Sequence, residues 1–271
     1  MLKRLSRNTR KRRKNMPAKL LVLGLDAATW DIILPNLDKL PNFRKLLDDK
    51  RISHSTIHLK ERPHSASIWC SMFSGLSPDE HKHENFHKNG DVLGRKDVNA
   101  DFIWDILGKK YDIKALNIPF VCPPYNFNCE FFPDEFGFST TPKVIEKNFN
   151  MQEKKAIEIL KTNPEIFITV FTALDHISHF YWGSEKIVEW YKKVDKLVGK
   201  LLKLADKFII ISDHGFCSWE KSKVHTLPEK TKDGRKIAGD HSPEAIVITN
   251  LDFKIEKPQD VFSCILKYFL K

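Results

Sequence analysis

The sequence has no apolar run long enough to cross a lipid bilayer. Hydrophobic residues make up 41% of its 271 residues, but no stretch approaches the roughly 18 consecutive apolar residues that a membrane-spanning helix needs. The apolar run at 20–25 is shorter than the core of a secretory signal peptide, and it leads directly into Asp26. We therefore expect neither a transmembrane segment nor a signal peptide.

Cysteine is also scarce, and the five cysteines form no CxxC pair. An odd number without paired spacing fits neither a zinc ribbon nor a disulfide framework. Disulfides are rare in reducing compartments, so we expect a cytoplasmic protein whose thiols are reduced and pack in its interior. These cysteines are Cys70, Cys122, Cys129, Cys217 and Cys264.

Acidic residues are missing from the first 15 positions, although the whole chain contains 35 of them. Eight positive charges lie there, so the remaining chain keeps only about +2 of the formal net charge of +10. The sequence predicts a basic, disordered tail over 1–17, in which residues 3–14 could contact nucleic acid or an anionic surface. The alternative is a solvated extension, with Met16 as the true start.

The body of the chain, 18–271, has no internal repeat and fits one large domain. Short apolar runs typical of buried strands alternate with segments whose apolar residues follow helical spacing. This alternation predicts an α/β fold, a three-layer α/β/α sandwich around a mostly parallel sheet. The predicted strands lie at 19–25, 113–118, 166–171, 207–211 and 245–249. The predicted helices lie at 36–50, with an interruption near Pro41, and at 65–74, 100–109, 142–161, 185–205 and 258–270.

The apolar strand at 207–211 ends abruptly in Ser212, Asp213 and His214. Ligands bind at the carboxyl ends of the strands in open α/β sheets. An oxygen donor beside a nitrogen donor suits a borderline cation such as Zn²⁺. Taken alone, the pair could equally be a strand-end turn that caps a helix.

Other predicted strands also end in carboxylates or imidazoles, so coincidence explains the Asp213 and His214 pair less well. Three carboxylates and three imidazoles would make two three-residue cation sites, and two divalent ions about 3.5–4 Å apart can hold both reacting oxygens of a displacement at phosphorus. The serine begins a predicted helix, where the dipole favours an anion, although serine is also a common plain N-cap. In chain order the groups are Asp26, Ser65, Asp175 with His179, Asp213 with His214, and His241.

The order and local contexts of these residues resemble the alkaline phosphatase superfamily, and within it the type I phosphodiesterase/nucleotide pyrophosphatase family. The similarity covers roughly residues 19–250. Each motif is modest alone, but their common order is a specific signal. The matching motifs are LGLDAATW at 23–30, PHSASIW at 63–69, SGLSPDEH at 74–81, DHISH at 175–179, SDHGF at 212–216 and GDHSP at 239–243.

The resemblance implies a role for each of the seven residues. Ser65 would be the catalytic nucleophile that attacks phosphorus and forms a covalent phosphoryl-enzyme intermediate. Two divalent ions are implied, Zn²⁺ first and Mn²⁺ as the alternative because of the carboxylates. One ion would be held by Asp26, Asp213 and His214, and the other by Asp175, His179 and His241.

The chain departs from the family pattern in three places. Ser65 stands where family members usually carry threonine, which also supplies a hydroxyl. Ser67 stands where many have proline, a change that affects entry into the helix more than the chemistry. The family's His-Gly-Ile is His81-Lys82-His83 here, and the missing glycine leaves the shape of this loop open.

The expected function is a two-metal phosphoesterase that acts on phosphodiester or pyrophosphate bonds of nucleotide-like or other small phosphorylated substrates. A phosphomonoesterase of the same fold is the first alternative, since Arg62, the only arginine near the nucleophile, could serve a monoester. The second is a catalytically idle binding protein whose basic tail docks on nucleic acid. Substrate identity and oligomeric state stay open, because the loops that recognise leaving groups carry no readable code.

Overall fold

The computed structural model describes residues 17–133, 140–231 and 233–270. The predicted basic tail, including the contact assigned to residues 3–14, lies outside this part except for Pro17. Within the described ranges, no helix is both long and apolar enough to cross a membrane.

The fold is built on a seven-stranded mixed sheet whose four central strands are parallel. β1 pairs in parallel with β7 and β8, and β5 pairs in parallel with β7, while β11 and β6 run antiparallel to their neighbours. This arrangement confirms the predicted mostly parallel sheet. The order is β2 (Ser53–His58), β11 (Glu244–Thr249), β8 (Ala205–Ile211), β1 (Ala18–Leu25), β7 (Ile166–Phe171), β5 (Ile113–Ile118) and β6 (Tyr125–Phe127).

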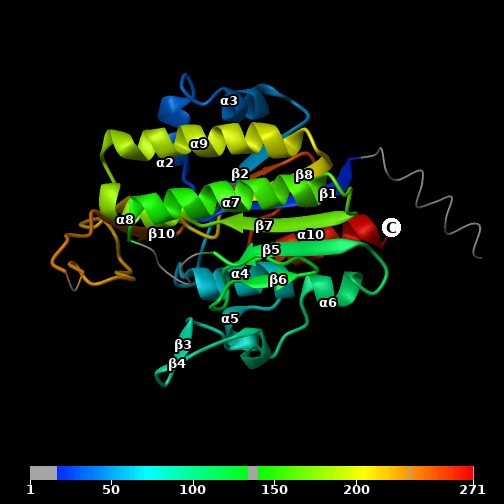
Figure 1. Ribbon diagram of the computed structural model, residues 1–271, viewed down its shortest axis with the longest axis horizontal. Helices are drawn as coiled ribbons and strands as arrows, with labels where there is room; N and C mark the ends of the chain where they lie inside the picture. Colours follow the sequence, from blue (N-terminus) through cyan, green and yellow to red (C-terminus); the bar gives the residue numbers. More distant parts are fainter. Residues whose placement is uncertain (1–16, 134–139, 232, 271) are drawn as a thin grey trace, which may run out of the picture.

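Helices cover both faces of the sheet, and the central strand β1 explains why. Leu21 and Leu23 belong to one buried core, and Leu20 and Val22 belong to the other. Successive side chains of a strand point to opposite faces, so a wholly apolar strand needs a cover on each side. The predicted three-layer α/β/α sandwich is therefore confirmed (Figure 1).

The first core lies under one group of helices and the second under another, as Figure 1 shows for α7 and α9 on one side and α4 and α6 on the other. The first group is α2 (Trp30–Ile33), α3 (Pro41–Asp48), α7 (Pro142–Leu160), α8 (Ala173–Tyr181) and α9 (Glu185–Leu202). The second is α4 (Ser65–Ser74), α6 (Ile103–Leu107) and α10 (Asp260–Phe269). The remaining short elements are α5 (Pro78–His81), two 3-10 turns (Leu34–Asn36 and Arg95–Asp97), and the hairpins β3 (His87–Lys88) with β4 (Asp91–Val92) and β9 (Gly215–Ser218) with β10 (Gly239–Ser242).

Several elements differ from the expectation. The helix predicted over 36–50 begins only at Pro41, because proline is favoured in the first turn of a helix and the preceding residues form a 3-10 turn. The polar edge strand β2 and the short strand β6 were not predicted, since neither has the apolar pattern of a buried strand. The two unpredicted strands are the end strands of the sheet, so the central strands are as predicted.

Candidate metal centre

The candidate residues meet at one edge of the sheet because of the strand directions. Asp26 directly follows β1, Asp213 follows β8, and α8 with Asp175 follows β7. These three strands are parallel, so their carboxyl ends lie together. β11 runs the opposite way, so its beginning, and β10 with His241 just before it, reach the same edge.

The first group of ligands, called here the histidine-rich cluster, contains Asp175, His179 and His241. Asp175 and His179 lie one turn apart on α8, so they share one face of the helix. Asp175 Oδ1 is 3.1 Å from His241 Nε2 and 3.4 Å from His179 Nε2, and the two Nε2 atoms are 3.3 Å apart. All three donor atoms therefore converge on one point.

The second group, the carboxylate-rich cluster, contains Asp26, Asp213 and His214. His214 Nε2 lies 3.3 Å from Asp213 Oδ2 and 3.5 Å from Asp26 Oδ1. The Ser65 hydroxyl oxygen is 3.3 Å from the same Nε2. The predicted nucleophile thus stands beside one cluster, at the first residue of α4, where helix amides and the dipole favour an anion.

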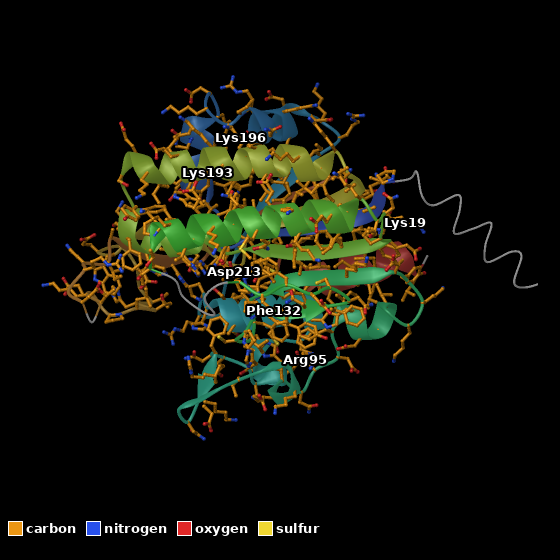
Figure 2. All side chains as sticks on the ribbon, in the orientation of Figure 1. Lys19, Arg95, Phe132, Lys193, Lys196 and Asp213 are labelled. Carbon is orange, nitrogen blue, oxygen red and sulfur yellow. The ribbon has the colours of Figure 1, made fainter. Side chains whose placement is uncertain are left out.

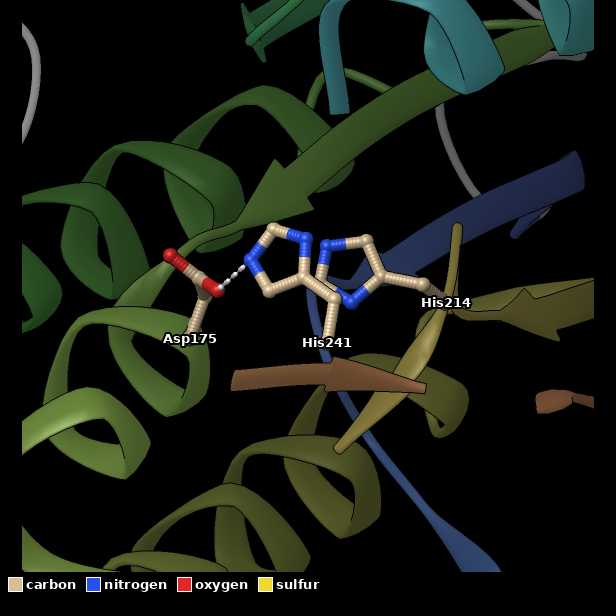
Figure 3. A group of neighbouring side chains, drawn as sticks. All are labelled: Asp175, His214 and His241. Carbon is tan, nitrogen blue, oxygen red and sulfur yellow. Dashed lines mark ion pairs between the residues drawn. The ribbon is translucent and has the colours of Figure 1, made fainter. Parts of the chain in front are cut away.

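The two clusters adjoin one another. The rings of His214 and His241 are stacked, with centroids 3.6 Å apart and an angle of 18° between their planes. Figure 3 shows these rings beside Asp175, whose carboxylate points at His241. All seven candidate residues are at most 9% exposed, so the sheet edge holds a compact, buried set of oxygen and nitrogen donors.

Backbone carbonyls fix the orientation of all three imidazoles. The Nδ1 atoms of His179, His214 and His241 lie 3.1, 2.9 and 2.7 Å from the carbonyl oxygens of Gly239, Gly215 and Pro63. A carbonyl can only accept, so Nδ1 donates and the Nε2 of each neutral ring presents a lone pair to the cluster. Metal-binding histidines are commonly held in this way.

The carboxylates also fit a cation. Asp26 Oδ1, Asp175 Oδ1 and Asp213 Oδ2 are buried without a hydrogen-bond partner among the described residues, although buried polar atoms normally have one. Tetrahedral donors about 2.05 Å from a zinc ion would be about 3.3 Å apart, and the donor separations in the histidine-rich cluster are 3.1 to 3.4 Å. The residues present therefore suit divalent metal ions.

Burial and crowding shift the acidity of these groups. Burial raises the pKa of Asp213 to about 7. Burial, followed by the charges of Asp213 and Asp175, also raises the pKa of Asp26. Burial lowers the pKa of His214, and the neighbouring His241 adds to this effect. The buried carboxyls of Asp26 and Asp213 can thus exchange a proton for a cation, whereas the neutral His214 ring can bind one without losing a proton.

The loop that departs from the family pattern keeps a glycine-like backbone. Lys82, which replaces the expected glycine, has a φ of 55° and ends α5 in the left-handed region. His81 contacts Ser71 through Nε2 at 2.9 Å and accepts a bond from the His83 amide through Nδ1. His81 is therefore committed to holding the loop.

Asn85 is exposed on the segment that follows this loop. Its Oδ1 accepts a hydrogen bond from the Phe86 amide at 2.7 Å. Phe86 in turn lies against the ring of His64, the residue before Ser65, with centroids 5.5 Å apart. The loop thus lies next to the turn that precedes Ser65.

Asp240 was missed by the sequence reasoning. Its side chain is fully buried, and one carboxylate oxygen lies within 4.8 Å of the ligand nitrogens of His179 and His241. Asp240 lies beside His241 in the GDHSP motif, which is the sequence signal that could have identified it. Only His241 was predicted as a ligand from this motif.

The matching family model decides the family of this chain. The model for type I phosphodiesterase/nucleotide pyrophosphatase matches residues 20–262. The chain belongs to this family. A search of curated protein sequences finds no match.

Solved structures agree on the fold, although their sequences are distant. The murine ectonucleotide pyrophosphatase/phosphodiesterase 5, an inactive variant in complex with AMP, is 14% identical with a TM-score of 0.63, covering 92% of this chain and 94% of that one. The human protein gives a TM-score of 0.61 at 14% identity and the same coverage. Phosphonoacetate hydrolase from Sinorhizobium meliloti 1021 gives 0.50 at 15% identity, covering 81% of this chain and 59% of that one. The predicted alkaline phosphatase-like fold is confirmed.

Proposed function

We propose that this family member is a two-metal phosphodiesterase or nucleotide pyrophosphatase with Ser65 as its nucleophile. The observation that carries the proposal is the pair of adjoining clusters with Ser65 at their edge. The Ser65 hydroxyl oxygen is 3.3 Å from His214 Nε2, and the clusters share a stacked pair of rings. A single divalent ion would need only one of the two sets.

The residues of the chain have distinct tasks in this proposal. Two divalent ions, Zn²⁺ or alternatively Mn²⁺, would supply Lewis acidity and lower the pKa of the nucleophilic hydroxyl. Ser65 Oγ gives its proton to water and attacks phosphorus. The bond to the leaving oxygen breaks, and that oxygen departs with the bond's electrons and takes up a proton from water. The first amides of α4 hold a phosphoryl oxygen. Water then displaces Ser65 from phosphorus and regenerates the hydroxyl.

A diester is the favoured substrate class. A monoester dianion carries more charge than a diester and needs additional cationic groups around its free oxygens. Arg62 is the nearest arginine to Ser65 in the sequence, and its side chain is exposed. The AMP in the murine neighbour's structure places nucleotides first among the natural compounds to screen.

The test compares hydrolysis of a nitrophenyl phosphodiester and a nitrophenyl monoester with added Zn²⁺ or Mn²⁺. We expect diester hydrolysis by the wild type and a loss of at least about a thousandfold in Ser65→Ala, since a missing nucleophile commonly costs this much. Ser67→Ala is the matched control, because Ser67 is a buried serine in the same helix. A variant starting at Met16 tests whether residues 1–15 contribute.

The outcomes separate the alternatives. Faster hydrolysis of the monoester would keep the two-metal site and replace the diesterase by a phosphomonoesterase. Equal rates in Ser65→Ala and wild type would remove Ser65 from the mechanism. A protein that binds no metal and hydrolyses neither ester would leave the idle binding protein as the better explanation.

A further inference from the structure

Asp240 is a buried carboxylate outside the two predicted ligand sets, although one of its oxygens lies within 4.8 Å of the donor nitrogens of His179 and His241. Its Oδ1 accepts hydrogen bonds from the His241 amide at 2.7 Å and from the Thr226 hydroxyl at 2.5 Å. Its Oδ2 accepts a bond from the Thr226 amide at 2.7 Å. This fully buried carboxylate therefore links the candidate ligand His241 to Thr226, a loop residue 14 positions before Asp240 in the sequence.

Thr226 lies in the middle of loop 219–238, which connects β9 and β10. The loop contacts the histidine-rich cluster at two further points. The Ser222 hydroxyl donates to the His241 carbonyl at 3.1 Å, and the Ala238 amide donates to the His179 carbonyl at 2.7 Å. The loop thus supports the backbones of two candidate ligands, and Asp240 joins its midpoint to the strand that carries His241.

We propose that Asp240 is a positioning residue. Together with Thr226 it forms a latch, which holds His241 and the loop around Thr226 in the arrangement that binds metal. The inference rests on the proposed function, because the arrangement matters only if the cluster binds metal. A hydrogen-bonded carboxylate beside a ligand residue restricts the ligand's orientation, and loss of such a partner typically costs 10- to 100-fold in metal affinity.

The latch needs a carboxylate because every partner is a donor. The amide of Thr226, the hydroxyl of Thr226 and the amide of His241 all point at Asp240. In Asp240→Asn, an oxygen is replaced by an NH₂ group, so an N–H would face a buried donor. Leaving a buried donor without an acceptor is costly, so the loop or β10 must shift.

Loop 219–238 also carries two exposed lysines close to Thr226 in the sequence. Lys221 and Lys223 lie within five positions of Thr226, and Trp219 packs against His225 with ring centroids 4.3 Å apart. Cationic side chains near a buried metal site raise the local concentration of an anionic substrate. The latch would therefore also fix the position of the loop segment that carries these lysines.

The test measures Zn²⁺ binding by equilibrium dialysis and elemental analysis in five forms of the full chain: wild type, Asp240→Asn, Thr226→Val, Thr226→Ser and Thr231→Val. We expect Asp240→Asn to weaken binding at one site 10- to 100-fold and Thr226→Val to weaken it less. Thr226→Ser keeps the hydroxyl and should bind like the wild type. Thr231→Val is the control in the same loop, because the Thr231 hydroxyl contacts only loop residues.

Limited trypsin digestion gives a readout that does not depend on metal. Cleavage after Lys221 and Lys223 should be faster in Asp240→Asn and Thr226→Val than in wild type and Thr231→Val. Melting temperatures show which variants are folded. If Asp240→Asn is unfolded, Thr226→Val tests the latch instead. Wild-type zinc affinity and wild-type digestion in folded variants would overturn the latch alone. A wild type that binds no zinc would instead overturn the proposed function.

Discussion

Hydrogen bonding at Nδ1 separates the candidate ligands from other histidines of this chain. In His241, Nδ1 faces the Pro63 carbonyl and Nε2 is left for the cluster. In His81, Nδ1 accepts from a backbone amide and Nε2 contacts Ser71, so both nitrogens are engaged in holding a loop. Both histidines are buried, so burial alone does not distinguish a ligand from a structural residue.

The two clusters should lose their ions independently. His179 belongs only to the histidine-rich cluster and Asp26 only to the carboxylate-rich cluster, whereas His214 and His241 lie where the two meet. We expect two divalent ions per wild-type chain and one in His179→Ala or Asp26→Asn, measured by elemental analysis after dialysis. The control is His225→Ala, which changes a histidine of loop 219–238 and should keep both ions. Two tightly bound ions in either cluster variant would contradict the ligand assignment.

The candidate site could be predicted from sequence because its residues follow strands. Asp26, Asp175 and Asp213 each come just after an apolar run, and parallel strands bring such positions together. Asp240 could not be recognised in the same way, because its partner Thr226 lies in a polar loop without periodicity. Contacts between a loop and a strand depend on the folded path of the loop, which no local pattern encodes.

At the level of single elements, Gly24 in β1 allows α4 to lie close to the sheet. A Cβ atom at this position would lie 2.7 Å from the Trp69 ring and 2.7 Å from the Val170 side chain. The indole of Trp69 donates to Asp26 Oδ2 at 3.2 Å. The close approach of helix and strand therefore also orients a candidate metal ligand.

Gly24→Ala should lower both stability and metal affinity. Overpacking typically costs about 1–3 kcal/mol, and movement of Trp69 would disturb Asp26 in the carboxylate-rich cluster. Thermal unfolding and metal titration measure the two effects. Gly94→Ala is the control, because its added Cβ would come no closer than 3.6 Å to Asp97. Unchanged melting and unchanged titration in Gly24→Ala would show that the ring can move without consequence.

Asp195 on α9 caps the start of α3 from a distance. Its carboxylate accepts from the amides of Asn42 and Phe43 at 2.9 and 2.8 Å and from the Asn42 side-chain amide at 2.8 Å. Asp195→Ala would leave these donors without an acceptor, so we expect a loss of about 2 kcal/mol in the free energy of unfolding.

Denaturant unfolding measures this loss, and the exposed Asp48→Ala in α3 serves as the control, with a change within about 0.5 kcal/mol. Metal stoichiometry should stay unchanged in Asp195→Ala, since Asp195 contacts neither cluster. A wild-type midpoint for Asp195→Ala would mean that water replaces the cap at no cost.

Over the whole molecule, the sequence predicted the centre of the sheet better than its edges. β7 begins and ends where its nearly unbroken apolar run does, because a strand covered on both faces is mostly apolar. β5 also has the predicted bounds, although it contains Lys114 and Asn117. The edge strand β2 is mostly exposed and polar, so nothing in its composition separates it from a loop. The buried central strands determine the α/β/α architecture, so this architecture could be predicted from the sequence.

Charged side chains lie both on the surface and in the interior, and the buried Asp213 makes the stability depend on pH. Figure 2 shows Lys193 and Lys196 along α9 and Asp213 in the middle of the molecule. Asp213 is fully buried, and burial raises its pKa to about 7 from a usual value of 3.8. Without metal, the folded protein keeps a proton on this acid that the unfolded chain releases, so the contribution of Asp213 to stability falls between pH 4 and about 7.

Added Mn²⁺ should therefore stabilise the protein more as the pH rises from about 5 to about 8. Asp213 must release its proton before it binds a cation, and so must His241, whose pKa is raised by its contacts with Asp175 and Asp240 although burial alone would lower it. At 100 times the dissociation constant we expect about 2.7 kcal/mol, or about 5–10 °C in melting temperature. Thermal scans with Mn²⁺ or a chelator measure the shift at each pH. A shift that is equal at pH 5 and pH 8, or equally pH-dependent in Asp213→Asn, would show that Asp213 does not release a proton to bind the ion.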